Sequence, residues 1–290
     1  MANLTKNYKK DFSSKGYAIF RNWFDKDKLN LFYRDVLNIS YFYLLKIKSK
    51  KNKLNKIYNS NKSFYEKYCL IHDLYEKDHK DVLHQTQKLI EQNLQIQNLF
   101  NDNKTINIFK NFLNIHKDQP IFFHGPNVFV NRPRVKRLLY KWHHESSFYP
   151  KRQNFLNVWI PIFKNKTSNN GTMKVKVSSH KLKEIPINEY IGYDTKTLNG
   201  KNSFFQKEIP ARYIKRFKTK SMDLNVGDMV VFDKKLAHSS SINKSKSYTF
   251  ALVLRVWEFS KDFTFSHDFG VTHNRYSRDE VDGHPEIDIS

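Results

Sequence analysis

The sequence predicts a mainly β protein with flanking helices, in which a helical part over residues 1–115 precedes an antiparallel double sheet. Apolar residues recur at intervals of three and four through residues 25–37 and 81–100, as on the buried face of a helix. The second half instead contains β-rich runs at residues 122–130, 155–163, 173–177, 229–233 and 248–258, separated by loops rich in Gly, Asn, Lys and Pro. With 290 residues, 39% of them hydrophobic, the chain can bury one large core. We therefore expect a single domain over residues 1–290.

Each element follows from its local pattern. Residues 16–20 predict a short strand, and Asp25 can cap the helix that follows it. A second long helix is expected from about residue 81 to residue 100, and the basic segment 46–56 is expected to be a solvated loop. The double sheet should occupy residues 116–262. The polar tail, residues 263–290, is expected to form a loose extension or a lid.

Composition limits the classes of function. The lone Cys69 fits a reducing compartment, and neither a secretory signal nor an apolar run of membrane-spanning length is found, so we expect a cytoplasmic protein without a membrane span. The net charge of +23 could attract a polyanion, but the lysines are spread along the chain. We therefore expect a small-molecule substrate rather than a nucleic acid partner, and the same field would steer that substrate if it is anionic. The oligomeric state is not predicted.

One pair of residues stands out as a candidate metal site. His143 and Glu145 are two residues apart, and His238 follows 93 residues after Glu145. Two histidines and one carboxylate can hold one face of a non-haem iron(II) ion while the opposite face stays open. Ligands at positions i and i+2 reach one ion only from an extended segment, because on a helix they point in different directions. His143 and Glu145 lie between strand-like runs, which favours this geometry.

Chance must be weighed, because a His followed two residues later by an acid should occur about once in a chain of this composition, and it occurs four times. The pair at 79 and 81 begins a helical pattern, the pair at 284 and 286 has no later histidine, and the pair at 116 and 118 follows a helix end. The sequence context therefore favours the pair at 143 and 145.

An ordered set of short motifs resembles the phytanoyl-CoA dioxygenase family of iron(II)/2-oxoglutarate oxygenases. The motifs cover residues 12–256 and lie at residues 16–24, 131–133, 142–145, 149–150, 158–160, 169–173, 178–181, 227–232 and 238–245. The resemblance implies a double-stranded β-helix, that is a cupin-like jelly roll. It also implies that the protein is an oxidoreductase using iron(II), 2-oxoglutarate and oxygen, with ascorbate as a reductant.

Carried over to this chain, the resemblance makes His143, Glu145 and His238 the iron ligands and places Ser240 and Trp159 beside 2-oxoglutarate. The alternative for Trp159 is a packing role in the core. We expect His238 on a loop just beyond the strand at residues 229–233. A glutamate ligand has one more rotatable bond than an aspartate, so Glu145 should ligate loosely unless a further residue fixes it.

Thr249 departs from the family pattern. The family usually has an arginine eleven residues after the distal histidine, where it pairs with the distal carboxylate of 2-oxoglutarate; here that residue is Thr249. Another cation must replace the arginine, or binding is weak, or the cosubstrate differs. The candidates are Lys174, Lys176, Lys246 and Arg255, with Lys176 ranked first.

The substrate is expected to be small and polar or anionic. His144 and Tyr149 are the residues expected to contact it, although His144 fits an ordinary polar loop position nearly as well. Two other functions stay open. The Thr249 substitution could have left an inactive metal-binding jelly roll with a binding or regulatory role, and a basic nucleic-acid-binding module with incidental histidines is the third interpretation.

Overall fold

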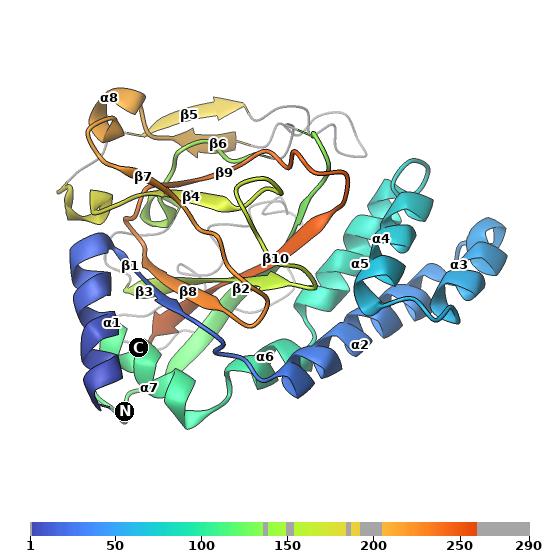
Figure 1. The fold of residues 1–290 in the computed structure, drawn as a ribbon, viewed down its shortest axis with the longest axis horizontal. Helices are drawn as coiled ribbons and strands as arrows, with labels where there is room; N and C mark the ends of the chain where they lie inside the picture. Colours follow the sequence, from blue (N-terminus) through green and yellow to red (C-terminus); the bar gives the residue numbers. More distant parts are fainter. Residues whose placement is uncertain (1, 136–138, 149–153, 184–186, 192–204, 260–290) are drawn as a thin grey trace, which may run out of the picture.

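The protein consists of three layers: helices, a larger sheet and a smaller sheet (Figure 1). The computed structural model describes residues 2–135, 139–148, 154–183, 187–191 and 205–259. The predicted tail at 263–290 lies outside these residues. The helical first part and the sheet-rich second part confirm the predicted fold class.

Most helices precede the sheets in sequence, and they cover one face of the larger sheet. The first helix α1 and the strand β1 come before the long helix α2, whose predicted cap is confirmed because the Asp25 carboxylate accepts a hydrogen bond from the Asp27 amide. The helices are α1 (Ala2–Lys15), α2 (Lys26–Leu44), α3 (Lys51–Tyr58), α4 (Phe64–Tyr75), α5 (Lys80–Glu91), α6 (Leu94–Phe100), α7 (Asn103–Leu113) and α8 (Ala211–Ile214).

Two helical predictions need correction. The single helix expected from residue 81 to residue 100 is two helices, α5 and α6, because the Asn93 side chain accepts a hydrogen bond from the Gln95 amide and starts a new helix. The basic segment is not a loop: a short 3₁₀ turn (Lys48–Lys50) leads into α3. Leu54 of α3 is buried, and Ile57 and Tyr58 pack partly buried against the same core cluster, while the lysines of this helix face solvent.

The larger sheet has the strand order β1-β8-β3-β10-β2, all antiparallel. Its strands are β1 (Tyr17–Phe20), β2 (Ile121–Asn131), β3 (Phe155–Ile162), β8 (Met229–Asp233) and β10 (Thr249–Glu258). Each coincides with a predicted strand. The sheet thus joins the start of the chain to its second half.

Alternate residues of the larger sheet face different layers, as the two-residue period of a strand requires. On β10, Phe250, Leu252 and Leu254 belong to the core shared with the helices, whereas Ala251 and Val253 belong to the core between the sheets. Thr249 and Arg255 have the same parity as Ala251 and Val253. Both therefore lie on the inner face of the sheet.

The smaller sheet closes over that inner face. Its order is β7-β4-β9, with β4 (Met173–Lys176), β7 (Thr219–Ser221) and β9 (His238–Ser240). The β4–β9 register continues beyond the strands, since Asn170 forms a bridge with Asn243 in step with Val175 opposite His238. A separate hairpin pairs β5 (Asn188–Ile191) with β6 (Phe205–Glu208). This arrangement of antiparallel sheets is the expected jelly roll.

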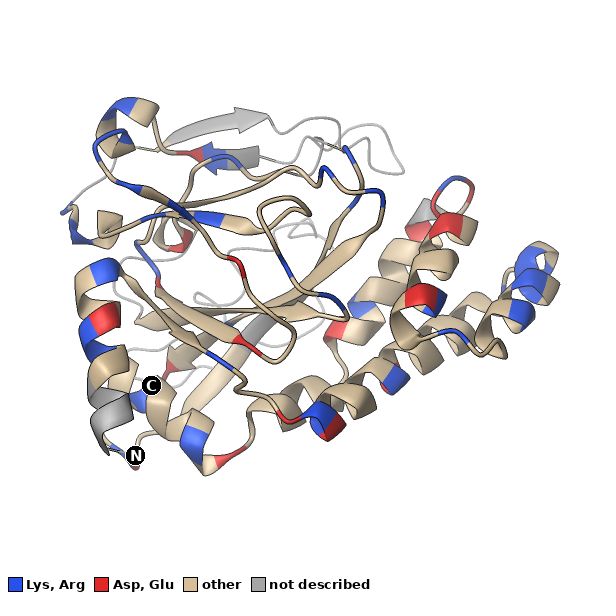
Figure 2. Cartoon of the chain, viewed as in Figure 1, with Lys and Arg blue, Asp and Glu red and all other residues tan. Residues whose placement is uncertain are grey.

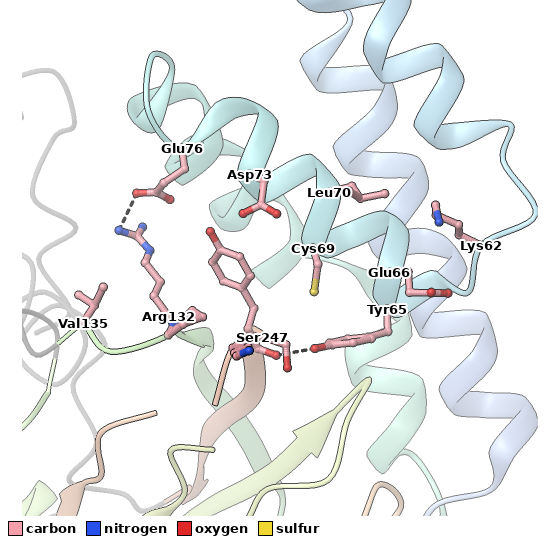
Figure 3. A pocket seen from close by; sticks show the side chains of 13 residues that line it. Lys62, Tyr65, Glu66, Cys69, Leu70, Asp73, Glu76, Arg132, Val135 and Ser247 are labelled. Atoms are coloured by element: carbon pink, nitrogen blue, oxygen red, sulfur yellow. Dashed lines mark hydrogen bonds and ion pairs between the residues drawn. The ribbon is translucent and has the colours of Figure 1, made fainter. Parts of the chain in front are cut away.

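A cavity of about 630 Å³ lies where α4 meets the loop before β10 (Figure 3). Tyr65 on α4 donates a hydrogen bond to the Tyr248 carbonyl at 2.8 Å, and Arg132 pairs with Glu76 across the cavity at 2.5 Å. These contacts attach the helical layer to the ends of β2 and β10. None of the described helices is both long enough and apolar enough to cross a membrane.

Candidate metal centre

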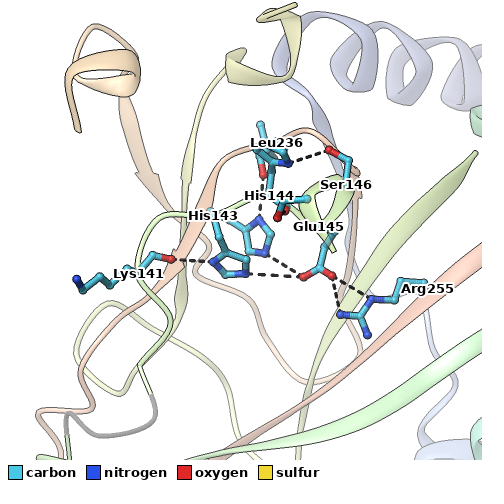
Figure 4. Close-up of polar contacts among 9 residues, drawn as sticks. Lys141, His143, His144, Glu145, Ser146, Leu236 and Arg255 are labelled. Atoms are coloured by element: carbon cyan, nitrogen blue, oxygen red, sulfur yellow. Dashed lines mark hydrogen bonds and ion pairs between the residues drawn. The ribbon is translucent and has the colours of Figure 1, made fainter. Parts of the chain in front are cut away.

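Three side chains converge between the two sheets (Figure 4). The Nε2 atoms of His143 and His238 each lie 3.7 Å from Oε1 of Glu145, and one ligand atom from each residue lies within 4.8 Å of the others. All three side chains are buried. The residues singled out by spacing alone are therefore brought together.

The backbone fixes this convergence. His143 and His238 form an antiparallel bridge in which each amide donates to the other's carbonyl at 2.9 Å. His144 is extended, with φ −133° and ψ 147°, so the side chains of His143 and Glu145 point to the same side. His238 is the first residue of β9 rather than part of a loop, which corrects the expected position. The strand pairing makes the position of His238 more rigid than a loop would.

The imidazoles are oriented for metal binding. Nδ1 of His143 donates to the Lys141 carbonyl at 2.7 Å, and Nδ1 of His238 donates to the Leu236 carbonyl at 2.9 Å. A carbonyl only accepts, so each Nδ1 must carry the proton and each Nε2 lone pair is left for a metal. Burial, and then the charge of His143, lower the pKa of His238, which favours the neutral form that ligation needs. This donor set fits an iron(II) ion.

Arg255 holds the third ligand. Its Nη2 and Nε donate to Oε2 of Glu145 at 2.7 and 3.2 Å, which leaves Oε1 facing the two imidazoles (Figure 4). Burial opposes ionisation of Glu145, but the Arg255 charge and the two imidazoles outweigh it and hold the pKa of that carboxyl well below its ordinary value. The sequence predicts Arg255 only as a candidate cation for 2-oxoglutarate. It is instead the residue that fixes Glu145.

His144 lies beside the triad but points elsewhere. It is buried, and its Nδ1 shares a hydrogen bond with the Ser146 hydroxyl at 2.8 Å. Burial, together with the neighbouring histidines, lowers the pKa of His144 to about 4. Tyr149, the other residue expected at the substrate, lies outside the described residues.

The two residues expected near 2-oxoglutarate both face the region between the sheets. Trp159 of β3 pairs with Val253 of β10 and is buried in the inter-sheet core. Ser240 follows His238 by two residues on β9, so it lies on the same face. Their positions are compatible with cosubstrate contact, and that role stays a prediction.

Thr249 meets a cation that sequence reasoning missed. Lys166, on the loop after β3, donates from Nζ to the Thr249 hydroxyl at 2.8 Å. Lys176 lies elsewhere: its neighbour Val175 faces the inter-sheet core, so Lys176 points away from that core, and its Nζ lies 3.3 Å from the Phe217 carbonyl. The geometry does not support ranking Lys176 first. No local pattern distinguishes Lys166 from the chain's many exposed lysines.

Asn157 is a further inner-face residue without an expected role. It lies opposite Arg255 on one side and Phe232 on the other, and it is fully buried. Neither its amide nitrogen nor its amide oxygen has a hydrogen-bond partner among the described residues. An unpaired buried amide opposite Arg255, which holds Glu145, marks a position where a bound molecule could supply the partner.

The fold and the donor set together define a jelly-roll oxygenase of the non-haem iron class. The sequence model of the phytanoyl-CoA dioxygenase (PhyH) family matches residues 12–249. The chain belongs to this family of iron(II)- and 2-oxoglutarate-dependent oxygenases, and it is therefore an oxidoreductase. The predicted family, the enzyme class and the use of iron(II) and 2-oxoglutarate are confirmed. No curated protein matches the sequence.

Solved structures show the same fold at low sequence identity. A non-heme monooxygenase, ThoJ in its apo form, has a TM-score of 0.53 and 13% identity, covering 87% of this chain and 77% of that one. EvdO2 from Micromonospora carbonacea var. aurantiaca, complexed with 2-oxoglutarate, has a TM-score of 0.51 and 14% identity over 87% and 90% of the two chains. EctD from S. alaskensis, with bound Fe, has a TM-score of 0.51 and 14% identity over 87% and 75%.

Proposed function

We propose that this protein is a 2-oxoglutarate-dependent hydroxylase of a small polar or anionic metabolite, with His143, Glu145 and His238 as its iron ligands. The observation that carries the proposal is the buried triad in which both Nδ1 atoms donate to backbone carbonyls and both Nε2 atoms face Oε1 of Glu145. Iron and 2-oxoglutarate, when bound, supply oxygen activation coupled to oxidative decarboxylation.

The residues around the triad hold the ligands and exclude water. Arg255 keeps Glu145 ionised and turned toward the imidazoles, and the strand pairing keeps the two histidines at a fixed separation. The aromatic ring of Phe232 packs edge-on against the His238 ring at 5.0 Å. An apolar wall of this kind keeps bulk water from the reacting atoms.

Basic groups border the segment that carries the ligands, which supports an anionic substrate. Lys207 donates to the Ser147 carbonyl at 2.5 Å, and burial, followed by nearby positive groups that include Lys235, lowers the pKa of His144. Figure 2 shows lysines and arginines on the helices, on the smaller sheet and on the loops, and the net charge of the chain is +23, so the general field of the protein is also positive. A positive field raises the local concentration of anions.

Anaerobic binding tests the metal assignment. Iron(II) and 2-oxoglutarate added to the wild type should give a visible charge-transfer band, and oxygen should then release succinate even without the true substrate. His143→Ala and Glu145→Ala should lose the band and most of the metal. Succinate release at the wild-type rate from both variants would remove the assignment. Metal binding by the wild type without any band would favour the inactive jelly roll.

A substrate panel tests the second half of the proposal. Sugar phosphates, nucleotides and polar amino acids should stimulate 2-oxoglutarate turnover, and the stimulation by anions should weaken as salt rises. Acyl-CoA thioesters are the contrasting class. Stimulation by these thioesters alone, independent of their phosphate groups, would overturn the expected polar pocket.

A further inference from the structure

Lys166 carries an ammonium group that is fully enclosed by protein. Its exposed fraction is 0%, and its Nζ donates to Oδ1 of Asn131 at 2.5 Å, to the Thr249 hydroxyl at 2.8 Å and to the Gly171 carbonyl at 3.2 Å. All three acceptors are neutral. The site is therefore polar, but it does not balance the charge of the ammonium group.

No carboxylate pairs with Lys166 in the part of the chain that the structure describes. Burial alone lowers the pKa of this lysine to about 7, and no neighbouring charge offsets the effect. A buried ammonium without a counter-ion is costly, and buried charges are ordinarily paired. An anion brought into contact with Lys166 would remove that cost.

The cradle around the ammonium is built by long-range contacts. The backbone of Lys166 exchanges hydrogen bonds in both directions with Leu224, which fixes the start of the side chain. Gly171 has φ +90°, and a Cβ there would lie 3.2 Å from the Asn131 side chain, so a glycine lets the two groups approach. The Thr249 hydroxyl donates to the Asn170 carbonyl at 2.7 Å, which turns its lone pairs toward Lys166.

The distance from the triad suits a dicarboxylate. Val175 lies opposite His238, and Gly171 precedes Val175 by four residues, which is at most about 13 Å along the chain because Gly171 lies in the turn before β4. Ser240 pairs with Met173, which lies between Gly171 and Val175 along the chain. A five-carbon diacid spans about 5 Å between its carboxyl carbons, and a metal bond at one end plus a hydrogen bond at the other bring the total to about 12 Å.

We propose that Lys166 binds the distal carboxylate of 2-oxoglutarate, in place of the arginine that this chain lacks at position 249; the inference rests on the function proposed above. The carboxylate would replace the Gly171 carbonyl, which makes the longest of the three hydrogen bonds. Nδ2 of Asn131 donates no hydrogen bond within the described residues and can add a second donor. Thr249 then supports the ammonium rather than the cosubstrate.

The test compares 2-oxoglutarate with 2-oxovalerate, a 2-oxo acid of the same chain length without the distal carboxylate. Anaerobic titration with iron(II), followed by the charge-transfer band and by calorimetry, gives the ratio of the two affinities without turnover. The variants are Lys166→Met and Lys166→Arg, with Lys176→Met as the matched control. Circular dichroism and iron binding confirm that each variant is folded with an intact triad.

Lys166→Met should weaken 2-oxoglutarate by about 10- to 100-fold, as for loss of a charge-assisted hydrogen bond, and leave 2-oxovalerate nearly unchanged. Lys166→Arg and Lys176→Met should keep the wild-type preference. An unchanged preference in folded Lys166→Met would overturn the role of Lys166, whereas a wild type without any band would overturn the proposed function instead. If Lys166→Met does not fold, Lys166→Gln, which keeps a hydrogen-bond donor without the charge, replaces it: a reduced preference for 2-oxoglutarate supports the site, and an unchanged preference overturns it.

Discussion

Arg255 and Glu145 form a buried two-point ion pair, with Nη2 and Nε of the guanidinium both donating to Oε2 of the carboxylate. The pair links the last part of β10 to the segment that carries two metal ligands. The ion pair fixes the orientation of the glutamate side chain. An aspartate has one rotatable bond fewer and would depend less on such a contact. Arg255 is therefore a positioning residue for the metal centre.

Replacing Arg255 tests this role. Arg255→Met leaves the Glu145 charge unpaired and its side chain free to rotate, so iron(II) affinity should fall by about 10- to 100-fold. Arg255→Lys keeps the charge but not the fork of two donors, so it should fall between wild type and Arg255→Met. Metal titration monitored by calorimetry measures all three. Wild-type affinity in Arg255→Met would show that Glu145 orients without help.

The candidate site was only partly predictable, for a physical reason. His143 and Glu145 could be identified because a local rule, the two-residue period of an extended segment, decides whether they share an ion. Arg255 lies 110 residues from Glu145, and Lys166 lies 83 residues before Thr249. Their contacts depend on the strand order β3-β10-β2 and on how the loop after β3 packs, which no local pattern encodes.

The fold itself was more accessible. Five strands of the larger sheet coincide with predicted runs because a strand buried on both faces is a short, apolar stretch between loop residues. The break between α5 and α6 was missed, since the helical period continues across it and one Asn93 side-chain hydrogen bond decides the break. Short strands such as β7 and β9 are held by their partners rather than by their own composition.

Asn157 provides a test of the inner face of the larger sheet. Asn157→Leu removes an unpaired buried amide, so the free energy of unfolding of the ligand-free protein should stay constant or rise by about 1 kcal/mol. Asn154→Leu is the control, because Asn154 donates to the Leu113 carbonyl at 3.0 Å and to Glu258 at 2.7 Å. That variant should lose about 1 to 3 kcal/mol. Denaturant unfolding distinguishes the two variants. An equal loss of unfolding free energy in both would mean that the Asn157 amide has hydrogen-bond partners in solution.

His72 should make the protein sensitive to acid. It is fully buried among aromatic rings, with both ring nitrogens unpaired in the described structure, and burial, followed by the Arg132 charge, lowers its pKa to about 3. The unfolded chain binds this proton below about pH 6.5 while the folded chain does not, so stability falls as pH drops from about 6.5 toward 3.

The variant His72→Phe isolates this contribution. Over that pH range, the free energy of unfolding should fall less steeply in the variant, by up to about 1.4 kcal/mol per pH unit. The phenyl ring is close in size to imidazole, so the aromatic packing should survive. Urea unfolding at a series of pH values gives both slopes. Parallel slopes would show that His72 takes up its proton in the folded state.

Lys166 should couple cosubstrate binding to proton uptake. The groups that face its ammonium are an amide, a carbonyl and a hydroxyl, none of which titrates, and burial lowers its pKa to about 7. At pH 8 the ligand-free lysine is therefore mostly neutral, while a bound carboxylate favours the charged form. Binding of 2-oxoglutarate should then take up close to one proton at pH 8 and almost none at pH 6.

Calorimetry in two buffers of different ionisation enthalpy measures that uptake with iron(II) present and oxygen excluded. Lys166→Arg should bind 2-oxoglutarate without proton uptake at pH 8, because a guanidinium stays charged throughout this range. Lys176→Met should behave like the wild type. The comparison separates a cation that touches the cosubstrate from a general positive field, since a field would attract 2-oxoglutarate without changing how many protons the protein holds. Uptake that persists undiminished in Lys166→Arg would assign the proton to another group.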